Sequence, residues 1–212
     1  MSTRLSDRKS GVFWDVDDFP VPEGRGIREI VESNLEKQGY KGEASITVYG
    51  EKDPFSPEET AKGRFTFVKR SDKYWRLHKM LTDIGLWVLE IPDRYRIPTN
   101  VVVVAKNISE NTDFVRFLEE LDSVDFNVSV VFPDDVKPAE VNIPEVRFAW
   151  YWKDFLEVGD PIPAAEYRIL LDQGERDNML FDPDDCGDDY SGEYDNDGGE
   201  YDEESCRMWT HY

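Results

Sequence analysis

The chain of 212 residues is long enough for one domain with a full hydrophobic core, and its 39% hydrophobic and 13% aromatic residues are typical of a folded protein. Its formal net charge of −21 argues against a broad basic face that neutralises nucleic-acid phosphates, and two cysteines exclude a disulfide framework. The sequence has no apolar signal region and no run long enough to span a membrane. We therefore expect an intracellular protein, cytoplasmic or nuclear, without membrane contact.

Short apolar segments rich in β-branched residues predict buried strands. They are residues 11–16, 44–50, 64–70, 100–105 and 126–133. Residues 100–105, NVVVVA, are almost wholly apolar, which is expected of a central strand covered on both faces. Residues 145–155 predict a final strand or an edge element.

Amphipathic segments between these strands predict helices over residues 26–40, 71–90 and 112–123. We expect Ser71 to cap the longest helix. Its broad apolar face is expected to comprise Trp75, Leu77, Met80, Leu81, Ile84, Trp87 and Val88. The alternation of strands and helices predicts an α/β fold, with an open, mostly parallel sheet and helices on both faces.

We expect this domain to occupy residues 10–160, with an extension over 161–175. Residues 171–212 contain 15 acids and only two basic residues, Arg176 and Arg207. Residues 182–204 contain no Val, Ile or Leu, so they cannot bury enough apolar surface to offset chain entropy. Residues 176–212 are therefore expected to form a disordered acidic tail, for which a basic protein is the expected partner.

Acidic residues follow the first predicted strand, where Asp15, Asp17 and Asp18 precede Pro20. Ligands of open parallel sheets bind beyond the carboxyl ends of the strands, and Asp15 lies at such an end. Two interpretations are open at this stage. The acids form a polar turn with an Asx hydrogen bond, or they hold a metal ion.

Two further acids could complete a metal site. Asp83 lies near the apolar flank of the longest predicted helix, where it is either a partnered acid or an exposed rim residue. Asp113 begins the helix after residues 100–105, where its charge also favours the helix dipole. Three converging carboxylates would suit Mg²⁺ or Mn²⁺ and the hydrolysis of a phosphodiester.

The segments VFWDVDDFPVP (residues 12–22) and GYKGEASITVYGEKD (residues 39–53) resemble the NYN nuclease domain of the limkain type. This domain occurs in the meiosis regulator and mRNA stability factor and in many plant proteins, and the similarity covers roughly residues 10–135. The resemblance implies a PIN-like (Rossmann-like) fold and metal-dependent cleavage of RNA. It also implies, by family analogy alone, a role in regulating gene expression and a peroxisomal location, for which the final residues WTHY supply no Ser-Lys-Leu signal.

The resemblance assigns catalytic and metal-binding roles to Asp15, Asp83 and Asp113. One acid of the family's S-G-D-x-D-F motif is absent, and Asn111 or Asn107 stands in its place, where an amide oxygen could still assist the metal. The expected function is a Mg²⁺- or Mn²⁺-dependent endoribonuclease with a partly degraded site. The alternative is an inactive regulatory module that binds RNA or protein.

Basic and aromatic residues alternate in VKRSDKYWRLHK, residues 68–79. The basic residues are Lys69, Arg70, Lys73, Arg76 and Lys79. With Tyr74, Trp75 and His78 they could line a groove for single-stranded RNA, in which bases stack on aromatic rings. The alternative is a helix whose aromatic residues face the core and whose charges face water.

Overall fold

A computed structural model describes residues 9–91, 99–124, 126–137, 146–163 and 166–169. The predicted tail over residues 176–212 lies outside these residues, as does most of the predicted extension over 161–175. None of the helices in the described part of the chain has both the length and the apolarity that a bilayer span requires.

Six parallel strands form one sheet in the order β3-β2-β1-β4-β5-β6. The strands are β1 (Ser10–Asp15), β2 (Ala44–Gly50), β3 (Phe65–Lys69), β4 (Asn100–Val104), β5 (Asn127–Phe132) and β6 (Phe148–Tyr151). The main helices are α1 (Ile27–Lys37), α3 (Lys73–Glu90), α4 (Thr112–Ser123) and α5 (Trp152–Leu156). The predicted α/β fold with an open parallel sheet is confirmed, and the segment 145–155 supplies both the edge strand β6 and helix α5.

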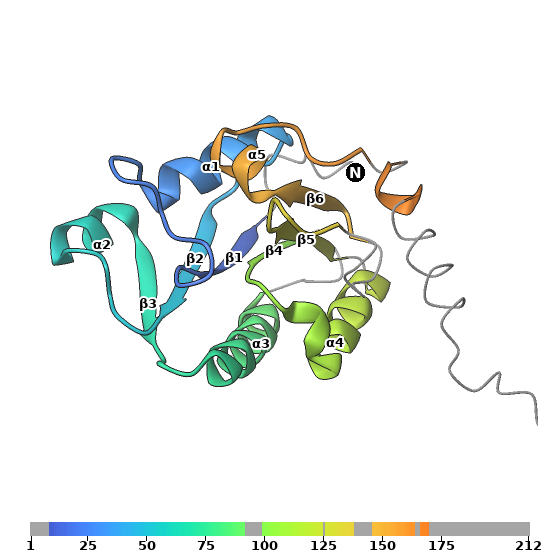
Figure 1. Cartoon of the computed structure of the whole chain (residues 1–212), viewed down its shortest axis with the longest axis horizontal. Coiled ribbons are helices and arrows are strands. Elements are labelled where there is room, and N and C mark those ends of the chain that lie inside the picture. Colours follow the sequence, from blue (N-terminus) through green and yellow to red (C-terminus); the bar gives the residue numbers. More distant parts are fainter. Residues whose placement is uncertain (1–8, 92–98, 125, 138–145, 164–165, 170–212) are drawn as a thin grey trace, which may run out of the picture. The chain divides into compact units, whose positions relative to one another are not determined.

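Helices cover both faces of the sheet, as Figure 1 shows for α1 and α5 on one face and α3 and α4 on the other. Alternation along each strand explains the two layers. In β1, Val12 and Trp14 pack with α1 and α5, whereas Phe13 packs with Met80 and Ile84 of α3. The four valines of β4 divide between the two faces in the same way, so after Asn100 every residue of this strand is apolar.

Two local features differ from the sequence prediction. A short helix, α2 (Pro57–Gly63), was not predicted, although its start carries a capping box. The Ser56 hydroxyl accepts a hydrogen bond from Glu59 N at 3.2 Å, and the Glu59 carboxylate accepts one from Ser56 N at 2.8 Å. The cap of α3 is Asp72 rather than Ser71, because the Asp72 carboxylate accepts a hydrogen bond from Trp75 N at 3.1 Å.

The chain order reverses between β1 and β4, which lie side by side in the middle of the sheet. Such a reversal opens a crevice at the carboxyl ends of the strands, where ligands of α/β proteins bind. The loop after β1 and the loop after β4 meet there, because the Asp18 carboxylate accepts a hydrogen bond from Lys106 N at 2.8 Å.

Candidate functional site: a carboxylate cluster with internal cations

Asp15 ends β1 at this crevice and has no exposed surface. Its Oδ1 atom accepts a hydrogen bond from Asp17 N at 3.1 Å, and Phe19 N donates to the Asp15 carbonyl at 3.1 Å. Trp14 Nε1 donates to the carbonyl of Phe19 at 2.7 Å and thereby closes the loop. The polar turn with an Asx hydrogen bond, one of the two interpretations drawn from the sequence, is therefore present.

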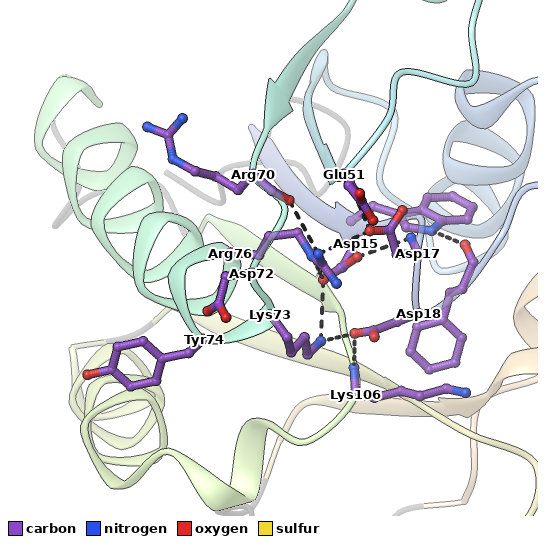
Figure 2. Close-up of polar contacts among 12 residues, drawn as sticks. Asp15, Asp17, Asp18, Glu51, Arg70, Asp72, Lys73, Tyr74, Arg76 and Lys106 are labelled. Atoms are coloured by element: carbon purple, nitrogen blue, oxygen red, sulfur yellow. Dashed lines mark hydrogen bonds and ion pairs between the residues drawn. The ribbon is translucent and has the colours of Figure 1, made fainter.

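The other oxygen of Asp15 faces two cations from the first turns of α3. Arg76 Nε donates to Asp15 Oδ2 at 2.8 Å, and Lys73 Nζ lies 3.3 Å from the same oxygen (Figure 2). Arg76 is only 5% exposed although it is charged. A buried guanidinium requires a buried counter-charge, and Asp15 provides it.

Asp17 and Asp18 extend this network on both sides. Arg76 Nη1 lies 3.1 Å from Asp17 Oδ2 and also donates to the carbonyl of Ser71 at 2.9 Å. Asp17 Oδ2 accepts a hydrogen bond from Glu51 N at 2.8 Å, and Lys73 forms an ion pair with Asp18. Three carboxylates thus share two cations, and the loops after β1, β2 and β4 are joined through them.

The guanidinium of Arg76 is strongly held as a cation. Burial acts to lower its pKa, but the hydrogen bond to Asp15 and the charges of Asp15, Asp17 and Asp18 outweigh burial, and the pKa is raised. Arg76 was predicted to contact RNA at the surface. The structure instead places it inside the carboxylate cluster.

Asp83 does not join this cluster. It lies seven residues beyond Arg76 on α3, which corresponds to about 10 Å along the helix axis. Its carboxylate accepts a hydrogen bond from the Tyr49 hydroxyl at 2.9 Å and pairs with Lys79. The pKa of Tyr49 is raised far above its usual value, first by burial and then by the charge and hydrogen bond of Asp83.

Asp113 and Asn111 lie at the start of α4, beside a cleft of about 570 Å³ between the beginnings of α3 and α4. The Asn111 side chain caps α4 by accepting a hydrogen bond from Phe114 N at 3.1 Å. Asn107 borders the same cleft and adopts a left-handed backbone with φ of 61°, which asparagine tolerates well.

Asp72 also borders this cleft and is an acid that the sequence reasoning missed. Its position just before the first turn of α3 is typical of a capping aspartate, and α3 begins at the carboxyl edge of the sheet. The resemblance gives the role of the helix acid to Asp83, near the apolar flank of α3, but the Asp83 side chain contacts Tyr49 rather than the crevice.

A comparison with protein families matches residues 9–145 to the NYN domain. The chain belongs to the NYN domain family. The match covers most of the described sheet and agrees with the resemblance drawn from FWDVDDFP. NYN domains are PIN-like domains of a nuclease family in RNA metabolism, and the specific limkain subgroup is not decided by this match.

No curated protein matches the chain. Among solved structures, it is similar to a short-chain dehydrogenase/reductase (wide type) from Veillonella parvula DSM 2008 in complex with NADP, at 14% identity and a TM-score of 0.28. That similarity covers 77% of this chain and 63% of the dehydrogenase. A TM-score this low supports no conclusion about this NYN domain.

The resemblance drawn from the sequence implies a divalent metal at the acid cluster, and the residues present at Asp15 do not fit one. Both oxygens of Asp15 already accept hydrogen bonds, and two cations occupy the space beside Oδ2. A divalent ion placed there would face strong repulsion from Lys73 and Arg76 at short range. Among the residues that the structure describes, no three acids, histidines or cysteines are grouped closely enough to hold a metal ion.

The other basic residues predicted to bind RNA differ in their surroundings. Lys79 is paired with Asp83, and Lys73 with Asp15 and Asp18, whereas Lys69 and Arg70 are exposed at the end of β3. The alternative in which aromatic residues face the core is wrong for two of them. Tyr74 is 57% exposed and Trp75 is 61% exposed, while Arg76 points inward.

Proposed function

We propose that this NYN-domain protein acts in RNA metabolism by binding RNA, with an acid cluster neutralised by its own side chains instead of by metal. One observation carries this proposal, the buried contact of Asp15 with Arg76 and Lys73. The cluster has the position of a nuclease centre in the fold, but its charges are compensated internally.

The balance of charge explains how the buried acid cluster would remain stable without a metal ion. A lone buried carboxylate is costly, and a metal ion or a basic side chain can each compensate it. Arg76 and Lys73 are covalently part of the domain, so they compensate Asp15 at every metal concentration. The domain would then retain a folded crevice without the ion that activates water.

A Mg²⁺- or Mn²⁺-dependent endoribonuclease is the second candidate. Two observations favour it: Asp72 and Asp113 border one cleft, and the Lys73 side chain is 31% exposed and so has room to move. In that case Lys73 would leave Asp15 when metal and RNA enter. Asp15, Asp113 and Asn111 would keep the roles that the resemblance gives them, whereas Asp83 would first have to leave Tyr49 and Lys79.

The subgroup, cellular role and location of the protein are proposed from the family resemblance. We place the protein in the limkain subgroup, with a regulatory role in gene expression and an intracellular site of action, cytoplasmic or nuclear, with a peroxisomal location as the family-based alternative. A basic protein partner for the acidic residues 176–212 is proposed from charge alone.

The test measures binding and cleavage of one labelled single-stranded RNA by the full chain, in Mn²⁺ and in EDTA. We expect binding in both solutions and cleavage in neither. Asp15→Asn removes the nearer of the two carboxylates that pair with the buried Arg76 and can therefore disturb the fold. The exposed variant Asp113→Asn is therefore measured beside it, and Asp160→Asn at an exposed distant position is the control.

Cleavage that requires Mn²⁺ and is lost in Asp113→Asn but not in Asp160→Asn would overturn the proposal in favour of the nuclease. Absence of RNA binding in both solutions by a folded sample would overturn both candidates.

A further inference from the structure

The outer face of α3 carries an exposed aromatic group next to the cleft between α3 and α4. Its members are Tyr74, Trp75 and His78, which we call the aromatic patch. Tyr74 and Trp75 leave more than half of their surface in water, and Tyr74 and His78 also border the cleft. Large exposed aromatic side chains grouped together indicate an interaction surface.

The rings are ordered relative to one another. The Tyr74 and His78 rings lie 3.9 Å apart between centroids with an interplanar angle of 37°, so they form a tilted stack. Trp75 stands edge-on to both, at 5.4 Å from Tyr74 and 6.1 Å from His78. Asp72 anchors this turn through its cap to Trp75 N, and Arg76 anchors it through Asp15. The ring faces are thus presented from a fixed helix turn.

We propose that the aromatic patch is a stacking surface for the bases of single-stranded RNA. This inference rests on the proposed RNA-binding function and names its contact site. Stacking suits a protein with a net charge of −21, because base faces carry no charge and ring contacts need no broad basic face. The exposed Lys69 and Arg70, directly before α3, would serve the phosphates of the same strand.

The lining of the cleft indicates which part of the RNA would enter it. Asp72, Glu110 and Asp113 border the cleft and would repel phosphate, and Lys73, which also borders it, is already paired with two carboxylates. Carboxylates accept hydrogen bonds from exocyclic amino groups such as N4 of cytosine. A base stacked on Tyr74 would therefore direct its amino edge into the cleft and its backbone outward. We expect oligo(C) to bind more tightly than oligo(U).

The experiment measures the affinity of labelled oligo(C) for the full chain by fluorescence anisotropy. Tyr74→Ala and Trp75→Ala should each weaken binding by about fivefold to a hundredfold, the range of one lost base stack, and Trp75→Phe should keep most of the affinity. The matched controls are Leu86→Ala and Leu89→Ala, which remove exposed apolar side chains from later turns of the same helix. They should leave the affinity unchanged.

The dependence on salt supplies a second readout. With only Lys69 and Arg70 contacting phosphates, the slope of log affinity against log salt should be no steeper than about −2, and Lys69→Gln should reduce it. A loss of affinity in Trp75→Ala with an unchanged slope is expected if the contact is a base stack.

Three results would overturn the inference in distinguishable ways. If the wild-type chain binds oligo(C) and both Tyr74→Ala and Trp75→Ala bind equally well, the patch is not the stacking site, while the proposed function stands. If the wild-type chain binds no RNA, both fail. If Trp75→Ala and Leu86→Ala both convert a sedimenting dimer to a monomer and neither affects RNA, the patch joins two copies of the chain.

Discussion

The Nε atom of Arg76 lies 2.8 Å from Oδ2 of Asp15, and the two residues are 5% and 0% exposed. Each side chain is the nearest opposite charge to the other inside the protein, although 61 positions of the chain separate the two residues. This contact joins the central strand β1 to the start of α3, so the charge state of the candidate site and the stability of the fold depend on the same two side chains.

Removal of either partner should therefore destabilise the domain. Asp15→Asn and Arg76→Gln should each cost up to about 3 to 5 kcal/mol, because Arg76 then keeps only Asp17, and Asp15 only Lys73, as a charged partner. The double variant should lose clearly less than the sum of the two. Urea denaturation of all four proteins measures this coupling.

The control is the surface pair of the half-buried Arg28 and the exposed Glu32, whose nitrogen and oxygen lie 2.7 Å apart. Glu32→Gln should change stability by about 1 kcal/mol or less. Additive losses for Asp15→Asn and Arg76→Gln would show that the two side chains are not coupled.

Divalent metal ions should raise the free energy of unfolding of the wild-type chain only slightly. An ion at a hundred times its dissociation constant would add about 2.7 kcal/mol to stability, and we expect no such gain for Mn²⁺ over EDTA. Arg76→Gln should gain affinity for Mn²⁺, because Asp15 and Asp17 then lose their shared cation. Calorimetric melting and the electron paramagnetic resonance signal of free Mn²⁺ measure both effects.

Arg28→Gln serves as the matched loss of one positive charge away from the site, and it should not acquire Mn²⁺ affinity. Strong stabilisation of the wild-type chain by Mn²⁺ that disappears in Asp113→Asn would show instead that the acids bind metal.

Tyr49 should make stability fall at alkaline pH. Burial and the nearby Asp83 raise the pKa of Tyr49, whereas tyrosine in the unfolded chain releases its proton near pH 10. Above about pH 10 the unfolded state binds fewer protons than the folded state, so the free energy of unfolding decreases as pH rises. The contribution of Tyr49 is complete below pH 10 and is lost above it.

Tyr49→Phe isolates this contribution. At neutral pH the variant should be less stable by about 1 kcal/mol, because the hydrogen bond to Asp83 is lost. The difference should shrink by about 1.4 kcal/mol for each pH unit above 10 and then change sign. Urea titrations at neutral and alkaline pH measure it, and the exposed variant Tyr74→Phe should parallel the wild type.

Asn111 should act as a helix cap. Asn111→Ala should cost about 1 kcal/mol, because Phe114 N loses its acceptor, and Asn111→Asp should retain the cap and the stability. The same urea titration measures both variants. Equal stability of Asn111→Ala and the wild type would contradict the capping role.

Much of the fold follows from the sequence because its determinants are local. The valine run of β4 and the apolar run of β1 predict strands, and the alternation of strands with helices predicts the parallel sheet. The position of Asp15 at a strand end could be read in the same way, since the apolar run ends there. The capping box at Ser56 was equally local and could have predicted α2.

The orientation of α3 could not be read in this way. Its sequence places Trp75 beside Leu77 and Met80 in an apolar pattern, which favours a buried tryptophan and an exposed Arg76. The structure has the reverse arrangement, because Asp15 offers Arg76 a buried counter-charge and because the first turn of α3 lies at the sheet edge, where Trp75 meets water.

The sequence by itself determined the sheet, its helices and the presence of acids at the end of β1, because hydrophobic periodicity and β-branching act over a few neighbouring residues. Only the tertiary structure decided which charges meet those acids. Lys73 and Arg76 reach Asp15 across more than 55 residues of chain, and a pairing at that separation depends on how α3 docks against the sheet. For this NYN domain, that docking determines whether the acids face a metal ion or the protein's own cations.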